Sequence, residues 1–264
     1  MGCDASDAGQ TPKLTSVFRR LIYNARFERG KAGPNAYNGA FDTFGDAERA
    51  APAGRPRGYD HLSLAGYYRE LASRPDVTDY PVLFWLQSVL CRPSRIFDFG
   101  GHIGVSAYAL RNHIASADSL RWTICDVPAI VREGEALARA RDRHDLQFTT
   151  DFHDADGADV LMASGSLQYV DAGFLAEELG TLQSPPRHVF VNRTPLHPSR
   201  RFFTVQCIGP TFNVYTVDQR DRFIEGMSQI GYRVVDSWDC PRRFEIPFCP
   251  GHELDAYSGL YFRL

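Results

Sequence analysis

A short stretch near the middle of the chain combines residue types that bind nucleotide-like ligands. Residues 96–99 form an apolar run with an acid at Asp98, and Gly100, Gly101 and Gly104 follow before a new apolar segment. Glycines permit positive φ and a close backbone approach, and a helix that begins there presents free N–H groups. The pattern predicts a strand, a tight turn and a helix that together hold a ligand.

The residues of this turn favour S-adenosylmethionine over a dinucleotide. The NAD fingerprint G-x-G-x-x-G, aligned on Gly104, requires glycine at the position of Phe99. A carboxylate at the strand end, as in Asp98, suits the cationic ammonium of S-adenosylmethionine better than a pyrophosphate, because like charges repel. His102 either contacts the cofactor carboxylate or points to solvent. We therefore expect cofactor contacts from Asp98, Gly100, Gly101, His102 and Gly104.

Two further acids follow the next two expected strands. Asp126 lies 22 residues beyond Gly104, and an acid about 20 residues past a glycine-rich loop can accept both ribose hydroxyls. The same residue could instead cap the helix that follows it, and the two roles can coexist. Asp151 is expected either to accept a hydrogen bond from the adenine amino group or to lie in a solvated loop.

Polar residues also follow the fourth expected strand, where groups around a reacting methyl would lie. Ser164 ends that strand and is expected to contact the cofactor, whereas Gln168 and Tyr169 are candidates for orienting the substrate. An aromatic face also attracts a sulfonium cation. The alternative is a helix cap and one buried aromatic side chain.

The fifth expected strand leads to Asn192, Arg193 and His197. The side-chain pKa of histidine suits general-base catalysis near neutrality, so His197 is the first candidate for removing a proton from an attacking hydroxyl. Arg193 could bind a substrate carboxylate or phosphate, and Asn192 is grouped with it as substrate-binding. Tyr67 and Tyr68, from an upstream helical pattern, are expected to enclose the substrate.

The elements that would position these residues alternate between strand and helix patterns. Such alternation predicts an α/β fold with a mostly parallel sheet, whose ligands bind at the carboxyl ends of the strands. We expect an N-terminal helical cap over residues 1–90, and a Rossmann-like domain over 91–264 with insertions near 198–217 and 240–257. The expected strands are 95–99, 119–125, 146–150, 159–163, 187–192, 232–238 and 258–264, and the expected helices are 104–115, 128–142, 171–182 and 218–230.

Composition excludes several classes of protein. The formal net charge of the 264 residues is −3, which argues against a general nucleic-acid binder. No apolar run is long enough to span a membrane, and the six dispersed cysteines fit a reducing cytoplasm better than a disulfide framework. We expect no metal, since the cluster of Cys240, Cys249 and His252 is too small for a structural zinc site.

Several motifs in fixed order resemble a poorly characterised family of class I S-adenosylmethionine-dependent methyltransferases. The resemblance covers nearly the whole chain after about residue 35, and many members of that family belong to surface-polysaccharide or natural-product pathways. His102 departs from the small residue usual at its position. The motifs are DFGGHIG, CDVPAIVREGEALA, ADVLMASGSLQYV and VNRTPLH, with GAFDTFGDAERA and GYDHL upstream.

This resemblance implies a seven-stranded sheet with an antiparallel last strand, and S-adenosylmethionine as the cofactor. It also implies methyl transfer, for which we expect an oxygen or nitrogen of a small molecule or sugar as the acceptor. We further expect a cytoplasmic enzyme that can form a homodimer. Two alternatives stay open at this point. One is a cyclase or lyase that converts the cofactor to methylthioadenosine, and the other is an NAD(P)-linked oxidoreductase.

Overall fold

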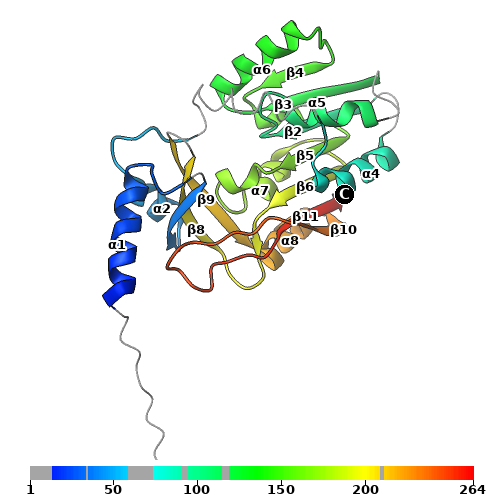
Figure 1. Cartoon of the computed structure of the whole chain (residues 1–264). Helices are drawn as coiled ribbons and strands as arrows, with labels where there is room; N and C mark the ends of the chain where they lie inside the picture. The colour runs from blue at the N-terminus through cyan, green and yellow to red at the C-terminus, as the bar shows by residue number, and fades with distance from the viewer. Residues whose placement is uncertain (1–13, 34, 59–73, 91–93, 115–118, 209–210) are drawn as a thin grey trace, which may run out of the picture.

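A computed structural model describes residues 14–33, 35–58, 74–90, 94–114, 119–208 and 211–264 of the chain. Two β-sheets organise these residues, one with seven strands and one with four. In Figure 1 the smaller sheet, with β8 and β9, lies to the left of the larger one, and α1 projects downward beside it.

The seven-stranded sheet confirms the expected Rossmann-like topology. Its strands are parallel except β11, which runs antiparallel to both of its neighbours. Every strand expected from the sequence is present within two residues of its expected bounds. In spatial order the strands are β10 (Arg233–Cys240), β11 (Tyr257–Arg263), β6 (His188–Thr194), β5 (Val160–Ser164), β2 (Ser94–Phe99), β3 (Leu120–Cys125) and β4 (Leu146–Thr149).

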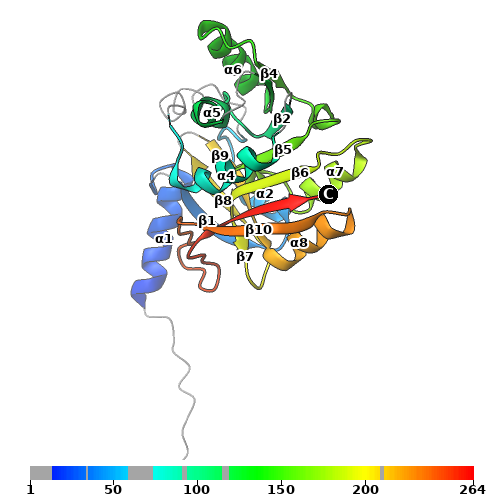
Figure 2. The same ribbon diagram turned by 90° about the vertical axis from the view of Figure 1, so that its right-hand side faces the viewer.

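Helices cover both faces of this sheet, as Figures 1 and 2 show. Neighbouring side chains of one strand point to opposite faces, so Ile96 and Phe97 of β2 belong to different apolar clusters. The cluster around Ile96 includes α4 (Tyr80–Val89), α5 (Val105–Leu110) and α6 (Pro128–Ala140). The cluster around Phe97 includes α7 (Phe174–Thr181) and α8 (Arg220–Gln229).

The four-stranded sheet includes a strand within residues 1–90, where we expected a helical cap. It is ordered β1-β8-β9-β7, so a strand from the N-terminal region pairs with the insertion after β6. β1 pairs with β8, which is distant in the sequence, and the local spacing of apolar residues carries no information about such a pairing. The strands are β1 (Ala36–Phe41), β7 (Leu196–His197), β8 (Phe202–Ile208) and β9 (Thr211–Gln219).

One face of the smaller sheet is covered by the N-terminal helices. Phe27 of α1 (Leu14–Glu28) and Ala47 of α2 (Phe44–Ala50) pack against Phe203, Val205 and Phe212. By contrast, α4 belongs to the core of the larger sheet, although it was expected in the cap. The division of the chain at residue 90 stays a prediction.

Gly259 of β11 allows the indole ring of Trp238 to lie directly against the backbone of β11. A Cβ atom at this position would overlap the indole ring of Trp238. The indole Nε1 donates a 3.0 Å hydrogen bond to Oδ1 of Asn192 at the end of β6. The missing side chain of Gly259 therefore helps to position a residue at the carboxyl end of the sheet.

We predict that Gly259→Ala lowers the free energy of unfolding by about 1–3 kcal/mol, because the added methyl group overpacks the core. Gly180→Ala is the matched control, since its Cβ would lie 3.6 Å from Ile230 Cγ2, in ordinary contact. Gly180 lies in α7, so alanine there is expected to be neutral or stabilising. Denaturant titration measures both variants, and equal stability of the two would contradict the packing argument.

Candidate functional site

A cleft of about 1610 Å³ lies at the carboxyl ends of the parallel strands. Phe99, Cys125, Ser164 and Arg193, from the ends of β2, β3, β5 and β6, line one side. Residues of β1, β8 and β9 line another. The cleft thus lies where ligands bind in open α/β sheets, as expected from the sequence.

The turn after β2 has the geometry that its glycines predict. The φ angles of Gly100 and Gly104 are 66° and 91°, in the left-handed region. A Cβ atom on Gly100 would overlap the side chain of Ser166, and one on Gly101 would lie 2.6 Å from Cγ of Asp98. A side chain is therefore excluded at both positions, and both glycines line the cleft. Gly104 precedes α5 as its N-cap.

Asp126 connects this turn to the end of β3. Its Oδ2 accepts a 2.9 Å hydrogen bond from the backbone N–H of His102, and its Oδ1 accepts one of 2.8 Å from the N–H of Val127. Asp126 and His102 both line the cleft. The N-cap residue of α6 is Val127, so the structure does not support Asp126 as the cap itself. Instead, its carboxylate fixes the turn.

His102 adopts a φ of 56°, which is uncommon outside glycine. Its side chain is buried, and burial lowers its pKa to about 4. The imidazole is therefore neutral near neutral pH and can hydrogen-bond without carrying a charge into the site.

Asp98 lies beneath the turn rather than on the cleft surface. Its side chain is fully buried, and Oδ2 accepts a 3.3 Å hydrogen bond from Nε1 of Trp122. Oδ1 has no hydrogen-bond partner among the described residues. Burial, with a smaller contribution from nearby Asp126, raises the pKa of Asp98 to about 7. Direct contact between Asp98 and a cofactor stays a prediction.

The raised pKa of Asp98 predicts how stability depends on pH. In the folded protein the carboxyl keeps its proton up to about pH 7, whereas the ordinary pKa of such a group is 3.8. The resulting stabilisation is complete below the unfolded pKa and is lost as pH rises through the folded pKa. We expect the free energy of unfolding of the ligand-free protein to fall between these pH values relative to that of Asp98→Asn. Parallel pH profiles from denaturant titration would contradict this.

At the ends of β5 and β6, Arg193 bridges two polar groups. Its Nη2 donates a 2.9 Å hydrogen bond to Oγ of Ser164 and lies 3.5 Å from Oδ1 of Asp79. Asp79 belongs to the short helix η1 (Val77–Asp79), just before α4. Arg193, Ser164 and Asp79 all line the cleft, so the structure brings together two predicted site residues and one that the sequence did not indicate.

Asn192 lies behind this surface. It is almost fully buried and does not line the cleft. Its Nδ2 donates to the carbonyl oxygen of Thr78 at 3.1 Å, and its Oδ1 accepts from Trp238 Nε1 and Cys240 Sγ. The expected substrate contact is therefore not supported, because both the nitrogen and the oxygen of the amide form hydrogen bonds within the protein.

His197 lies away from the lining of the cleft, and its role as a general base stays a prediction. His197 lies in β7 of the smaller sheet, is buried, and does not line the cleft. Its Nδ1 accepts backbone N–H bonds from Ser199 at 3.1 Å and Arg200 at 3.2 Å. Burial and the nearby Arg200 lower its pKa. Its role in the structure is to stabilise the turn after β7.

The remaining predicted residues divide between the cleft and other places. Gln168 and Tyr169, in the short helix η5 (Leu167–Tyr169), line the cleft. Asp151 is exposed, accepts hydrogen bonds from the backbone and ring of His153, and is not part of the lining, so its adenine contact stays a prediction. Tyr67 and Tyr68 lie outside the described residues.

Sequence reasoning did not single out the residues with which the smaller sheet lines the cleft. Tyr37, Gln206, Asn213 and Tyr215 line it from β1, β8 and β9. These residues belong to no motif. The sequence predicted an insertion near 198–217, and its pattern did not show which side chains would point to the cleft.

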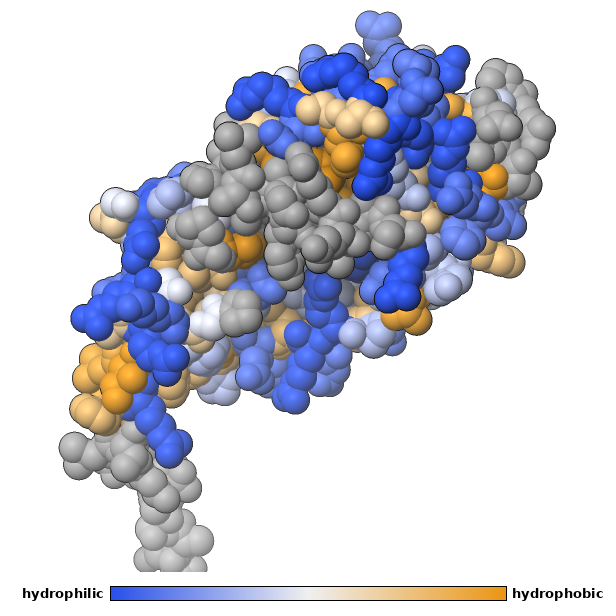
Figure 3. Space-filling model, turned by 45° about the horizontal axis from the view of Figure 1, so that its top comes forward, coloured by the Kyte–Doolittle hydropathy of each residue, from blue (hydrophilic) through white to orange (hydrophobic). Residues whose placement is uncertain are grey.

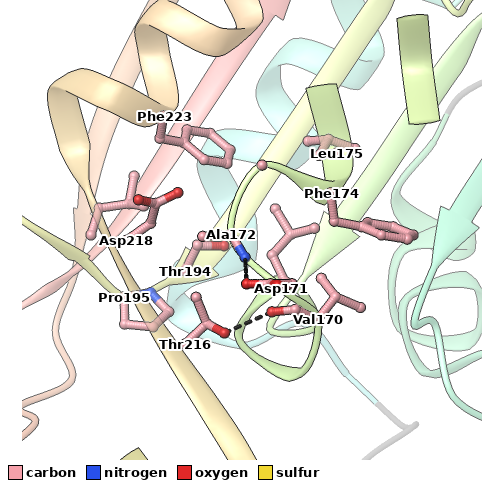
Figure 4. Close-up of a pocket in the computed structure, with 13 residues that line it drawn as sticks. Val170, Asp171, Ala172, Phe174, Leu175, Thr194, Pro195, Thr216, Asp218 and Phe223 are labelled. Carbon is pink, nitrogen blue, oxygen red and sulfur yellow. Dashed lines mark hydrogen bonds between the residues drawn. The ribbon is translucent and has the colours of Figure 1, made fainter. Parts of the chain in front are cut away.

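A second, much smaller cavity of about 20 Å³ lies where the two sheets meet (Figure 4). Its walls include Phe174 and Phe223, and Oγ1 of Thr216 donates a 2.7 Å hydrogen bond to the carbonyl oxygen of Val170 nearby. A space of this size holds about one water molecule. The larger cleft is therefore the candidate site for a cofactor and a substrate.

Neither a metal nor a membrane is indicated by the described residues. Among them, no group of three or more His, Cys, Asp or Glu side chains has the arrangement of a metal site. None of the helices described is both long and apolar enough to cross a bilayer.

Several solved structures have a similar fold. A didemethyltoxoflavin N1-methyltransferase from Burkholderia thailandensis is 17% identical, with a TM-score of 0.51 over 99% of this chain and 92% of that one. A magnesium protoporphyrin IX methyltransferase from Synechocystis PCC 6803 is 13% identical, with a TM-score of 0.51 over 77% and 99% of the two chains.

A third similar structure is an S-adenosylmethionine-dependent methyltransferase from Clostridium acetobutylicum, which is 7% identical. Its TM-score is 0.50 over 76% of this chain and 98% of that one. No family model matches the sequence, and no curated protein does. The fold of this chain is thus that of class I methyltransferases.

Proposed function

We propose that this protein is a methyltransferase that uses S-adenosylmethionine as its cofactor. The observation that carries the proposal is the bond between the glycine turn after β2 and Asp126 at the end of β3. Both elements line one cleft at the carboxyl edge of a sheet with the class I methyltransferase topology. The fold alone does not fix a reaction, so the proposal rests on these residues.

The described residues fit this cofactor. Gly100 and Gly101 let the turn pack directly against Ser166 and Asp98, where a Cβ atom would clash, and the backbone of both glycines lines the cleft. The carboxylate of Asp126 is oriented by two backbone N–H groups and suits a pair of ribose hydroxyls. Oδ1 of Asp98 is a buried acceptor beneath the turn. A cation bound above the turn would favour the ionised form of this carboxyl group.

When bound, S-adenosylmethionine supplies an activated methyl group, and the protein must align the acceptor atom with it. Gln168 and Tyr169, next to the end of β5, are placed to orient the acceptor. Arg193, held by Ser164, offers a positive charge to an anionic group of the substrate. The neutral ring of His102 adds a hydrogen-bonding group on the cofactor side.

Calorimetric titration with S-adenosylhomocysteine tests the proposal. We expect binding to the wild type, and binding at least about tenfold weaker for Asp126→Asn, because a hydrogen bond to a charged group contributes about 1.5–3 kcal/mol. Asp142→Asn is the matched control, since Asp142 is exposed and does not line the cleft. Its affinity should equal that of the wild type.

Absence of binding to the wild type, or tighter binding of NADH than of S-adenosylhomocysteine, would overturn the proposal. Incubation with S-adenosylmethionine and an accepted substrate then identifies the reaction. Release of S-adenosylhomocysteine indicates methyl transfer, whereas release of methylthioadenosine indicates cyclisation or cleavage of the cofactor.

Membership of the family that the sequence motifs resemble is part of the same proposal. So are an oxygen or nitrogen of a small molecule or sugar as the methyl acceptor, a role in natural-product or polysaccharide biosynthesis, and a cytoplasmic location. A homodimer is supported by exposed apolar side chains of α1. Figure 3 shows them gathered where that helix projects, and they belong to Val17, Phe18, Leu21 and Ile22.

A further inference from the structure

We propose that the cleft-facing side of β1, β8 and β9 is the subsite that binds the methyl acceptor, here called the acceptor subsite. We propose further that this subsite binds a planar ring bearing N–H or O–H donors. This inference rests on the proposed methyl transfer, because it assigns the substrate side of the same cleft. The observation that carries the inference is a row of neutral polar and aromatic side chains on these strands. Some of its buried oxygen atoms are hydrogen-bond acceptors to which no described group donates.

Strand register places the row on one face. Tyr37 of β1 is paired with Gln206 of β8, and Gln206 is paired with Asn213 of β9. Directly paired residues of neighbouring strands point to the same face of a sheet. The opposite face is covered by α1 and α2, so Tyr37, Gln206 and Asn213 face the cleft that they line.

The amide oxygens in this row are buried and unsatisfied. Oε1 of Gln206 and Oδ1 of Asn213 have no hydrogen-bond partner among the described residues, and the two residues are only 3% and 5% exposed. Nε2 of Gln206 donates a 3.0 Å bond to Tyr37 Oη, which orients the amide. A buried acceptor without a donor costs about 1–3 kcal/mol. A ligand that supplied the missing donors would remove this cost.

A third acceptor extends the row toward the end of β5. Oε1 of Gln168 is also buried without a partner among the described residues, while its Nε2 donates a 2.7 Å bond to the carbonyl oxygen of Gly165. The neighbouring Tyr169 packs edge-on against Tyr215 of β9, with ring centroids 5.5 Å apart. The wall is therefore continuous with the segment expected to surround the reacting methyl.

The aromatic residues of the wall favour a flat partner. The Tyr37 and Tyr215 rings meet edge to face at 5.1 Å, and the hydroxyls of Tyr215 and Tyr257 are 2.7 Å apart. Burial raises the pKa of Tyr37 and that of Tyr215, so both phenols stay protonated. Aromatic side chains bind planar rings through stacked and edge-to-face contacts, and donors in the plane of such a ring can meet acceptors that lie along one row.

The test measures binding of paired probes to the complex with S-adenosylhomocysteine. The probes are quinazolinedione and its N,N′-dimethyl derivative, and indole and N-methylindole. Each pair shares a ring, but only the first member carries N–H donors. We expect quinazolinedione to bind at least about tenfold more tightly than its dimethyl derivative, since the derivative leaves buried acceptors unpaired. We expect a smaller preference of the same sign for indole.

Asn213→Leu and Gln206→Leu remove one acceptor each while keeping the side-chain size. We expect each variant to reduce the preference for the N–H probe at least about threefold, with unchanged affinity for S-adenosylhomocysteine. Gln147→Leu is the matched control, because Gln147 is exposed in β4 and does not line the cleft. Its probe affinities should equal those of the wild type. Thermal unfolding of the variants checks that they remain folded.

The outcomes separate this inference from the proposed function. One outcome is that the protein binds S-adenosylhomocysteine, but its complex binds the two members of each probe pair equally or not at all. This outcome would overturn the acceptor subsite and leave the proposed cofactor intact. Tighter binding of methyl glucoside than of quinazolinedione would overturn the planar ring in favour of a sugar. Absence of S-adenosylhomocysteine binding would instead contradict the proposed function itself.

Discussion

The hydrogen bond from the backbone of His102 to Asp126 links the two strand ends on which the site depends. It closes the turn after β2 against the end of β3, on one side of the cleft. The same turn packs closely on Ser166 and Asp98, because Gly100 and Gly101 lack side chains that would strike them. Close packing of the turn backbone on neighbouring side chains is thus the constraint on this side of the cleft.

The opposite side of the cleft follows a different principle. There, side chains rather than backbone form the surface, and they come from a sheet inserted after β6 and completed by β1. The two sides are connected through η5, whose Tyr169 touches Tyr215.

The larger sheet and the glycine turn after β2 were predictable because their signals are local. Apolar runs such as residues 160–164 fix a strand, and the glycines after Asp98 fix a turn, whatever the rest of the chain does. The pairing of β1 with β8 was not predictable, because it joins residues far apart in sequence. His197 could not be located from the sequence for a related reason. Its position after the fifth strand suggested the cleft, whereas the β7–β9 pairing places it in the other sheet.

The pairing of β1 with β8 also bears on how the protein is assembled. Tyr37 and Gln206, which share a hydrogen bond across these strands, are 169 residues apart. During synthesis the N-terminal strand emerges long before its partner, and contacts of such long range form slowly. The larger sheet is largely synthesised before β8, up to β6, so the cleft acquires its second wall late. Until then, the covered face of β1 and the apolar sides of α1 and α2 lack the strands on which they pack, and this interval is when the young chain is most exposed to aggregation.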